Sequence, residues 1–229
     1  MDDMAVTIGA LGITCDRILS ARGQLPLDRF GGDRFNRVVD DFDTWVAEVF
    51  GDDETSGAWT ADPVAGTERL RHLFGHAGEI LAAYSDDQVG RGIRALWEED
   101  LHGLSDRRVA VQLRTGTLRA IVTLYREIFA ARIVVEDHEH PSRLEHACFM
   151  FFDVAPLDLG DETVLDVLEE ILAIDSAACQ RAALHGLGHA YFHVPQHVSP
   201  IVDRWLKRHR DAPEELRAYA ADARIGRVN

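Results

Sequence analysis

The stretch Cys179-Gln-Arg-Ala-Ala-Leu-His-Gly-Leu-Gly-His-Ala-Tyr-Phe-His193 carries the strongest fold signal in this chain. Its apolar residues recur at helical spacing, at Ala182, Ala183, Leu187 and Ala190. Gly186 and Gly188 each cost roughly 1 kcal/mol against alanine in a helix interior. A helix that contains two such residues indicates close approach of a neighbouring helix. We therefore expect an inner helix with other helices packed tightly against it.

The remainder of the chain also follows helical spacing. Helix starts are marked by Asp161 and by capping boxes that begin at Ser85 and Ser142. No segment shows the alternation of a strand with turn residues on both sides. We expect Gly116 to kink or divide the longest helix. The expected helices cover residues 5–21, 33–50, 68–84, 86–102, 106–134, 143–153, 162–174, 179–193, 197–208 and 214–224. The sequence therefore predicts an all-α protein.

Helix starts recur at a nearly constant interval. The predicted cap residues are Thr67, Ser105, Ser142, Ser176 and Asp211. Their spacings of 38, 37, 34 and 35 residues equal the length of a helical-hairpin repeat. We expect residues 67–229 to form one array of stacked hairpins, an α-solenoid. Residues 1–66 do not match a repeat unit, so we expect an N-terminal helical extension with a long loop at residues 51–66.

Three blocks of the C-terminal third carry a resemblance. They are Ala-Leu-His-Gly-Leu-Gly-His at 183–189, Val-Ser-Pro-Ile-Val-Asp-Arg-Trp-Leu at 198–206 and Tyr-Ala-Ala-Asp-Ala-Arg-Ile-Gly-Arg-Val at 219–228. Residues 142–224 resemble a degenerate HEAT- or armadillo-like array of an uncharacterised bacterial type. This resemblance implies a protein-binding scaffold and brings no catalytic motif with it.

The charge of the chain limits its partners. The formal net charge of -15 over 229 residues opposes binding to nucleic acid or anionic lipid and favours a basic protein partner. No apolar run reaches about 18 residues, so we expect no membrane span. The N-terminus has no signal-peptide pattern and the three cysteines are far apart, which predicts a cytoplasmic protein. The single lysine, Lys207, leaves Schiff-base or P-loop chemistry almost no candidate.

Acidic clusters are the candidate partner-binding surface. Several acidic turns on one side of a solenoid would attract an arginine- or lysine-rich protein. Such clusters also occur as ordinary solvated helix faces. The candidate contact residues are Trp59, Glu136, Asp137, Glu139, Asp166, Glu169 and Glu170. The first hypothesis is therefore a non-enzymatic acidic binding protein without a cofactor, acting as an adaptor or as an immunity-type inhibitor of a basic toxin.

Histidines at a four-residue spacing give the alternative hypothesis. His185 and His189 lie one helical turn apart, which makes a two-ligand zinc half-site. His193 is too far from His185, about 12 Å along the axis, to share one ion with it. A third ligand from Asp153, Asp175 or the His138–His140 segment would be needed, and nothing in the sequence places any of them there. Otherwise these histidines cap or pack between helices. The alternative is a metal-dependent hydrolase that uses His185 and His189, and a third is a helical small-molecule sensor with a pocket between the N-terminal helices and the array.

Overall fold

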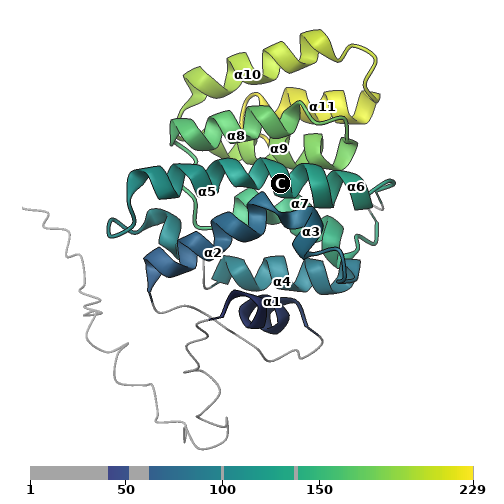
Figure 1. The fold of residues 1–229 in the computed structure, drawn as a ribbon. Helices are drawn as coiled ribbons and strands as arrows, with labels where there is room; N and C mark the ends of the chain where they lie inside the picture. The colour runs from purple at the N-terminus through teal and green to yellow at the C-terminus, as the bar shows by residue number, and fades with distance from the viewer. Residues whose placement is uncertain (1–40, 52–61, 99–100, 137–138, 229) are drawn as a thin grey trace, which may run out of the picture. The chain divides into compact units, whose positions relative to one another are not determined.

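The computed structural model describes residues 41–51, 62–98, 101–136 and 139–228. These residues form helices and no β-strand, so the prediction of an all-α protein is confirmed for this part of the chain. None of the described helices is long and apolar enough to cross a membrane. The elements, shown in Figure 1, are α1 (Phe42–Phe50), α2 (Pro63–Gly75), α3 (Ala77–Ile80), α4 (Asp86–Glu98), a 3-10 helix (Leu101–Ser105), α5 (Val111–Leu124), a π-helical turn (Tyr125–Phe129), α6 (Ala130–Arg132), α7 (Arg143–Val154), α8 (Glu162–Leu172), α9 (Ala177–Ala190), α10 (Pro195–Arg208) and α11 (Glu214–Ala223).

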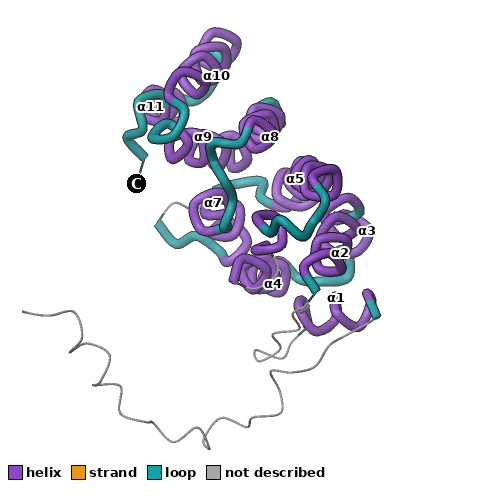
Figure 2. Tube along the Cα trace, turned by 90° about the vertical axis from the view of Figure 1, so that its left-hand side faces the viewer, coloured by secondary structure: helices purple, strands orange, loops and turns teal. Residues whose placement is uncertain are grey.

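The longer helices from α2 to α11 pack in two rows, seen end-on in Figure 2. In one row α2 contacts α5, α5 contacts α8 and α8 contacts α10. In the other row α4 contacts α7, α7 contacts α9 and α9 contacts α11. Helix α1, which lies in the predicted N-terminal extension, packs against α4. Helix α9 therefore has neighbours on several sides, as expected for an inner helix.

Four of the predicted helix starts are confirmed by their caps. Ser142 and Glu145 form the predicted capping box, and Ser85 forms one with Gln88. Asp161 caps α8 by accepting from Thr163 N at 2.7 Å. Ser176 accepts from Cys179 N and opens α9.

Three of the predicted caps are wrong. Thr67 lies inside α2, where its hydroxyl donates to Pro63 O, because Asp62 caps the helix five residues earlier. Ser105 ends the 3-10 helix and donates to Pro156 O instead of opening a helix. Asp211 lies in the turn before α11, whose N-cap is Pro213 and which begins at Glu214. Of the caps whose regular spacing predicted repeats, only Ser142 and Ser176 are therefore confirmed.

The long helix expected over residues 106–134 has a different interruption. It begins at Val111 and runs through Gly116 without a break. The change comes at Tyr125–Phe129, where the chain takes a π-helical turn before α6. At this turn Tyr125 is fully buried and its hydroxyl donates to Cys148 O on α7 at 2.8 Å. The break is thus associated with the packing of a large aromatic residue rather than with glycine.

Both glycines of α9 allow close approach, as predicted. A Cβ atom at Gly186 would lie 2.8 Å from Leu168 Cδ2 and 2.8 Å from Phe152 Cβ. A Cβ atom at Gly188 would lie 2.5 Å from both γ-carbons of Val228. Contacts this short are not tolerated in a packed interior. The two glycines therefore bring α9 against α7 and α8 on one side and against the C-terminal segment on another.

The expected helix at residues 5–21 and the first part of the one at 33–50 lie outside the described residues. So does most of the predicted loop at 51–66, although α2 already begins at Pro63.

Candidate functional site

Three side chains with metal-ligating atoms meet where α7 ends against α9. Asp153 comes from the last turn of α7, and His185 and His189 lie one turn apart on α9. His189 Nε2 lies 3.2 Å from His185 Nε2 and 3.2 Å from Asp153 Oδ1. One ligand atom from each residue lies within 4.8 Å of the other two, and no other such group occurs among the described residues. Two nitrogens bound tetrahedrally to zinc at about 2.0–2.1 Å lie about 3.3 Å apart, so these atoms have nearly the spacing of a metal's ligands.

His185 is the buried member of the group. Only 1% of its surface is exposed. Its ring lies against Phe149 of α7, with the ring centroids 4.2 Å apart. Its Nδ1 atom lies 2.7 Å from the hydroxyl of Tyr219 on α11. Contacts from α7 and α11 therefore hold this ring on both sides.

The hydrogen bonds fix where the protons lie on the two histidines. The contact between His189 Nε2 and the Asp153 carboxylate requires a proton on that nitrogen, because a carboxylate only accepts. His185 Nε2 faces the same N–H and therefore accepts. A neutral imidazole has one N–H, so His185 carries its proton on Nδ1 and donates it to the Tyr219 oxygen. The lone pair of His185 Nε2 is thus directed toward His189 Nε2, and a metal ion would be bound there once His189 gives up the proton on that nitrogen.

Burial sets the protonation state of this site. Burial, helped by the nearby His189 and opposed by Asp153, lowers the pKa of His185 to about 4. Burial also raises the pKa of Tyr219 to about 12, although the positive charge of Arg181 acts in the opposite direction. At neutral pH the site therefore contains a neutral imidazole and an un-ionised phenol. A neutral imidazole is the form that binds a metal, and a fixed partner on its second nitrogen is typical of metal-bound histidine.

Part of this site was predicted from the sequence. The i, i+4 pair of His185 and His189 lies on one face of α9 as predicted, and Asp153 is the one of the three proposed third ligands that reaches it. Asp175 does not reach it, and His138 lies outside the described residues. His193 lies beyond the end of α9 at Ala190, so the helix is shorter than predicted and contains His185 and His189 but not His193. Tyr219 and Phe149 were missed, because no spacing in the sequence connects them to His185.

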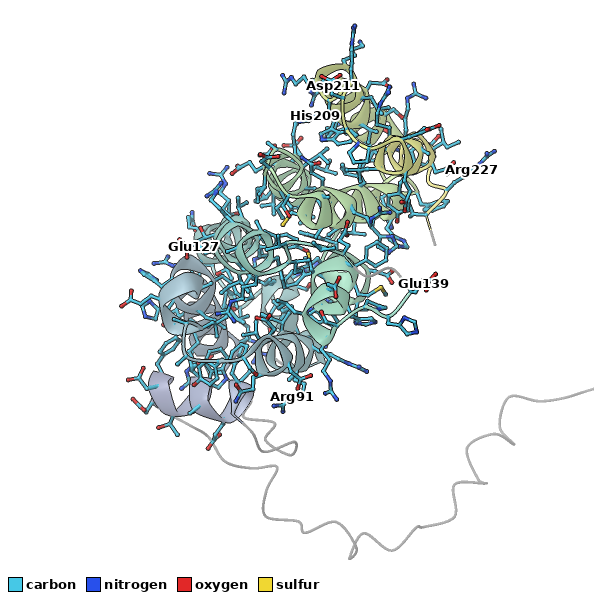
Figure 3. All side chains as sticks on the ribbon, turned by 90° about the vertical axis from the view of Figure 1, so that its right-hand side faces the viewer. Arg91, Glu127, Glu139, His209, Asp211 and Arg227 are labelled. Atoms are coloured by element: carbon cyan, nitrogen blue, oxygen red, sulfur yellow. The ribbon has the colours of Figure 1, made fainter. Side chains whose placement is uncertain are left out.

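The acidic residues proposed as one partner-binding surface are divided among several places. Glu169 of α8 pairs through both oxygens with Arg204 of α10 at 2.8 Å. Glu136 pairs with Arg181 of α9 at 3.5 Å. Glu139 is exposed before α7 and projects outward in Figure 3, and Glu170 is exposed on α8. Trp59 and Asp137 lie outside the described residues.

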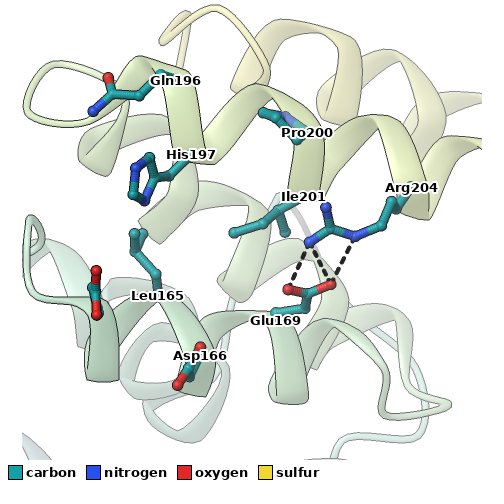
Figure 4. Close-up of a pocket in the computed structure, with 9 residues that line it drawn as sticks. Leu165, Asp166, Glu169, Gln196, His197, Pro200, Ile201 and Arg204 are labelled. Carbon is teal, nitrogen blue, oxygen red and sulfur yellow. Dashed lines mark hydrogen bonds and ion pairs between the residues drawn. The ribbon is translucent and has the colours of Figure 1, made fainter.

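A groove between α8 and α10 contains the densest part of that surface. It has a volume of about 330 Å³. Glu162, Asp166 and Glu169 line it from α8, and His197 and Arg204 line it from α10 (Figure 4). Leu165 and Ile201, both largely buried, also contribute to its lining. Its carboxylates therefore outnumber the one arginine that faces them.

Comparison of the chain with known protein families, with curated proteins and with solved structures finds no match.

Proposed function

We propose that this chain binds a divalent transition metal, with zinc the first choice, through Asp153, His185 and His189, and that the metal serves a hydrolytic reaction. The convergence of the three ligand atoms within 4.8 Å carries this proposal. Two nitrogens and one carboxylate oxygen are a ligand set that zinc accepts in catalytic sites. Tyr219 would orient His185 through its Nδ1–H.

Partial exposure of the site is what a catalytic metal needs. The side chains of Asp153 and His189 are 32% and 30% exposed, whereas His185 is buried. Three protein ligands leave at least one coordination position for water, and solvent can reach it from the exposed side. When bound, the metal would lower the pKa of that water and supply hydroxide at neutral pH. These features support a hydrolase over a purely structural metal site, which is usually closed by a fourth protein ligand.

Metal binding by the untagged protein tests this proposal. After chelator treatment and dialysis, we expect zinc or cobalt to bind at about one ion per chain by elemental analysis, and the cobalt form to show visible absorption. His189→Ala and Asp153→Asn should each abolish stoichiometric binding. His197→Ala, at a histidine on α10 that lines the other groove, is the matched control and should leave binding unchanged. Saturating metal should stabilise the protein by about 2.7 kcal/mol at 100 times the dissociation constant.

Two results would contradict the proposed metal site. One is less than about a tenth of an ion per chain with every metal tried. The other is equal loss of binding in His197→Ala and His189→Ala, which would indicate non-specific capture by histidines.

As a second candidate, we propose that the two helix rows are stacked hairpins of an α-solenoid and that the groove between α8 and α10 binds a basic protein segment. The pairwise packing of α2, α5 and α8 and of α4, α7, α9 and α11 supports the repeat arrangement. The three carboxylates of the groove, together with the net charge of -15, favour a basic partner such as a toxin.

Binding of a basic peptide tests this candidate function independently of the metal site. An arginine-rich peptide should bind at low salt and weaken as salt is added, because exposed charges are screened. Glu162→Gln combined with Asp166→Asn should weaken binding, whereas Glu139→Gln, at an exposed glutamate outside the groove, should not. Equal weakening by both sets of substitutions would show that only net charge matters.

A further inference from the structure

A second cavity lies where α4 meets the start of α7, and its charge is opposite to that of the chain. Its volume is about 380 Å³. It is lined by Arg91 and Arg94 of α4 and by Ser142, Arg143 and His146 at the start of α7. No aspartate or glutamate among the described residues lines it. In a chain with 39 acidic residues and 24 lysines and arginines, three arginines around one cavity are not expected from composition.

Gly90 allows the two walls of this arginine cavity to meet. A Cβ atom at Gly90 would lie 2.5 Å from Arg143 C and 2.7 Å from Leu144 N, both backbone atoms that cannot swing aside. Helix α4 therefore crosses directly against the first turn of α7. The positive end of the α7 dipole points toward the same place. Ser142 and Glu145 cap this helix end by bonding to each other's backbone N–H.

The neighbouring carboxylates leave the cavity with an excess of positive charge. Asp87 is shared between two of the arginines, at 3.0 Å from Arg143 Nε and 3.4 Å from Arg91 Nε. The side chains of Arg94 and His146 make no ion pair or hydrogen bond with another residue whose side chain is described. Among the described residues, two carboxylates, Asp87 and Glu145, thus lie beside three guanidinium groups. Arg91, labelled in Figure 3, is further fixed by donating to Gly51 O at 3.3 Å.

We propose that the arginine cavity binds the phosphate group of a small phosphomonoester. Guanidinium groups present paired N–H donors that match phosphate oxygens, and charge-assisted bonds of this kind are the strong ones. The volume of about 380 Å³ lies in the range of small-molecule sites, roughly 300–1,000 Å³. Nucleic acid does not fit, because its many phosphates would be repelled by a chain of net charge -15. Free phosphate shares the chemistry and is a separate arm of the test.

This cavity is independent of the candidate metal centre. Arg143 begins α7 and Asp153 lies near its other end. Their separation of ten positions corresponds to about 15 Å along the helix. The proposal therefore does not require a bound metal, and failure of one site leaves the other untouched.

The test is calorimetric titration of the metal-free, full-length protein with phenyl phosphate and with inorganic phosphate. We expect one phenyl phosphate per chain, bound more tightly than inorganic phosphate. Arg94→Gln should weaken binding on the order of tenfold, and Arg94→Gln combined with Arg143→Gln more strongly, because each removes charge-assisted hydrogen bonds. Arg119→Gln is the matched control, at an exposed arginine of α5 outside the cavity, and should leave binding unchanged.

The proposal is overturned if neither compound binds, or if Arg119→Gln weakens binding as much as Arg94→Gln. Equal affinity for the two compounds would also overturn it, because the site would then recognise free phosphate and not an organic phosphomonoester. Arg94 is exposed and makes no ion pair with a described side chain, so its substitution should leave the helical circular dichroism unchanged. Arg94→Lys keeps the charge but loses the paired donors, and intermediate affinity would identify the guanidinium geometry as the cause.

Discussion

The contact of α7 with α9 and that of α8 with α10 join neighbouring helices in very different ways. At the first, Gly186 lets α9 lie directly against Phe152, and the interface is closed. At the second, long polar side chains separate the helices and leave a groove of about 330 Å³. Both contacts include histidine and carboxylate. Only at the first is a histidine almost fully buried, with its pKa lowered to about 4 by that burial.

The difference teaches that residue type alone does not make a site. Glu169 and Arg204 remain 40% and 45% exposed, where water competes for each charge. His185 is held between Phe149 and Tyr219, and its Nε2 lone pair faces His189. Close helix packing is therefore what fixes the position of the His185 side chain.

Truncation of an aromatic residue should show the largest difference between the two contacts. Phe152→Ala removes a side chain that is 1% exposed and should lower the free energy of unfolding by about 3–5 kcal/mol. Ile201→Ala, in the wall of the open groove, should cost less, about 2 kcal/mol, because fewer packing contacts are lost there. Urea unfolding followed by circular dichroism measures both. Equal costs would mean that the groove is closed in solution.

Addition of one methyl group should distinguish the tight contact from an open one. Gly186→Ala gains roughly 1 kcal/mol of helix propensity but overlaps Phe152 Cβ, an atom fixed to the backbone, at a cost of about 1–3 kcal/mol. We expect net destabilisation of about 1 kcal/mol. Gly75→Ala is the control, because nothing lies within 4 Å of its added Cβ, and it should stabilise by about 0.4–1 kcal/mol. The same urea measurement applies, and stabilisation by Gly186→Ala would contradict the close approach.

Removal of the ion pair across the α8–α10 groove should have a small effect. Glu169→Gln leaves the shape of the side chain but removes its charge opposite Arg204. Since both partners are substantially exposed, we expect a loss of about 0.2–1 kcal/mol that shrinks in high salt. Glu170→Gln, at the exposed neighbouring residue, should change stability by less than about 0.5 kcal/mol. A loss above about 2 kcal/mol for Glu169→Gln would show that the groove excludes water.

The smallest expected effect depends on pH and lies between α10 and α11. Hydrogen bonds from Arg224, at 2.6 Å for the shorter one, hold the pKa of Asp203 below its usual value of 3.8. Because the folded pKa is the lower one, the stabilisation is present above about pH 4 and is lost as the pH falls through the folded pKa. Asp203→Asn should therefore cost up to about 1 kcal/mol at pH 7 and nothing at pH 2. Thermal unfolding at both values measures this, and a pH-independent cost would exclude the ionised pair as its cause.

The sequence by itself determined the helical class of the described residues and the meaning of two glycines. Apolar periodicity predicted the helices, and Ser85, Ser142, Asp161 and Ser176 marked four starts correctly, because a cap satisfies backbone groups within its own turn. Gly186 and Gly188 indicated a close neighbour without identifying it. The i, i+4 spacing of His185 and His189 placed them on one face, since helix geometry is local.

Only the tertiary structure decided which residues from different helices meet. Asp153 and Tyr219 are each more than 25 residues from His185, and the packing of α7, α9 and α11 brings them to it. The arginine cavity likewise joins α4, which carries Arg91 and Arg94, to α7, which carries Arg143. Two of the acidic residues that the sequence grouped in one surface pair with different helices, Glu136 with Arg181 of α9 and Glu169 with Arg204 of α10. Helix periodicity is a property of one segment, whereas a site depends on distances between segments that no single segment encodes.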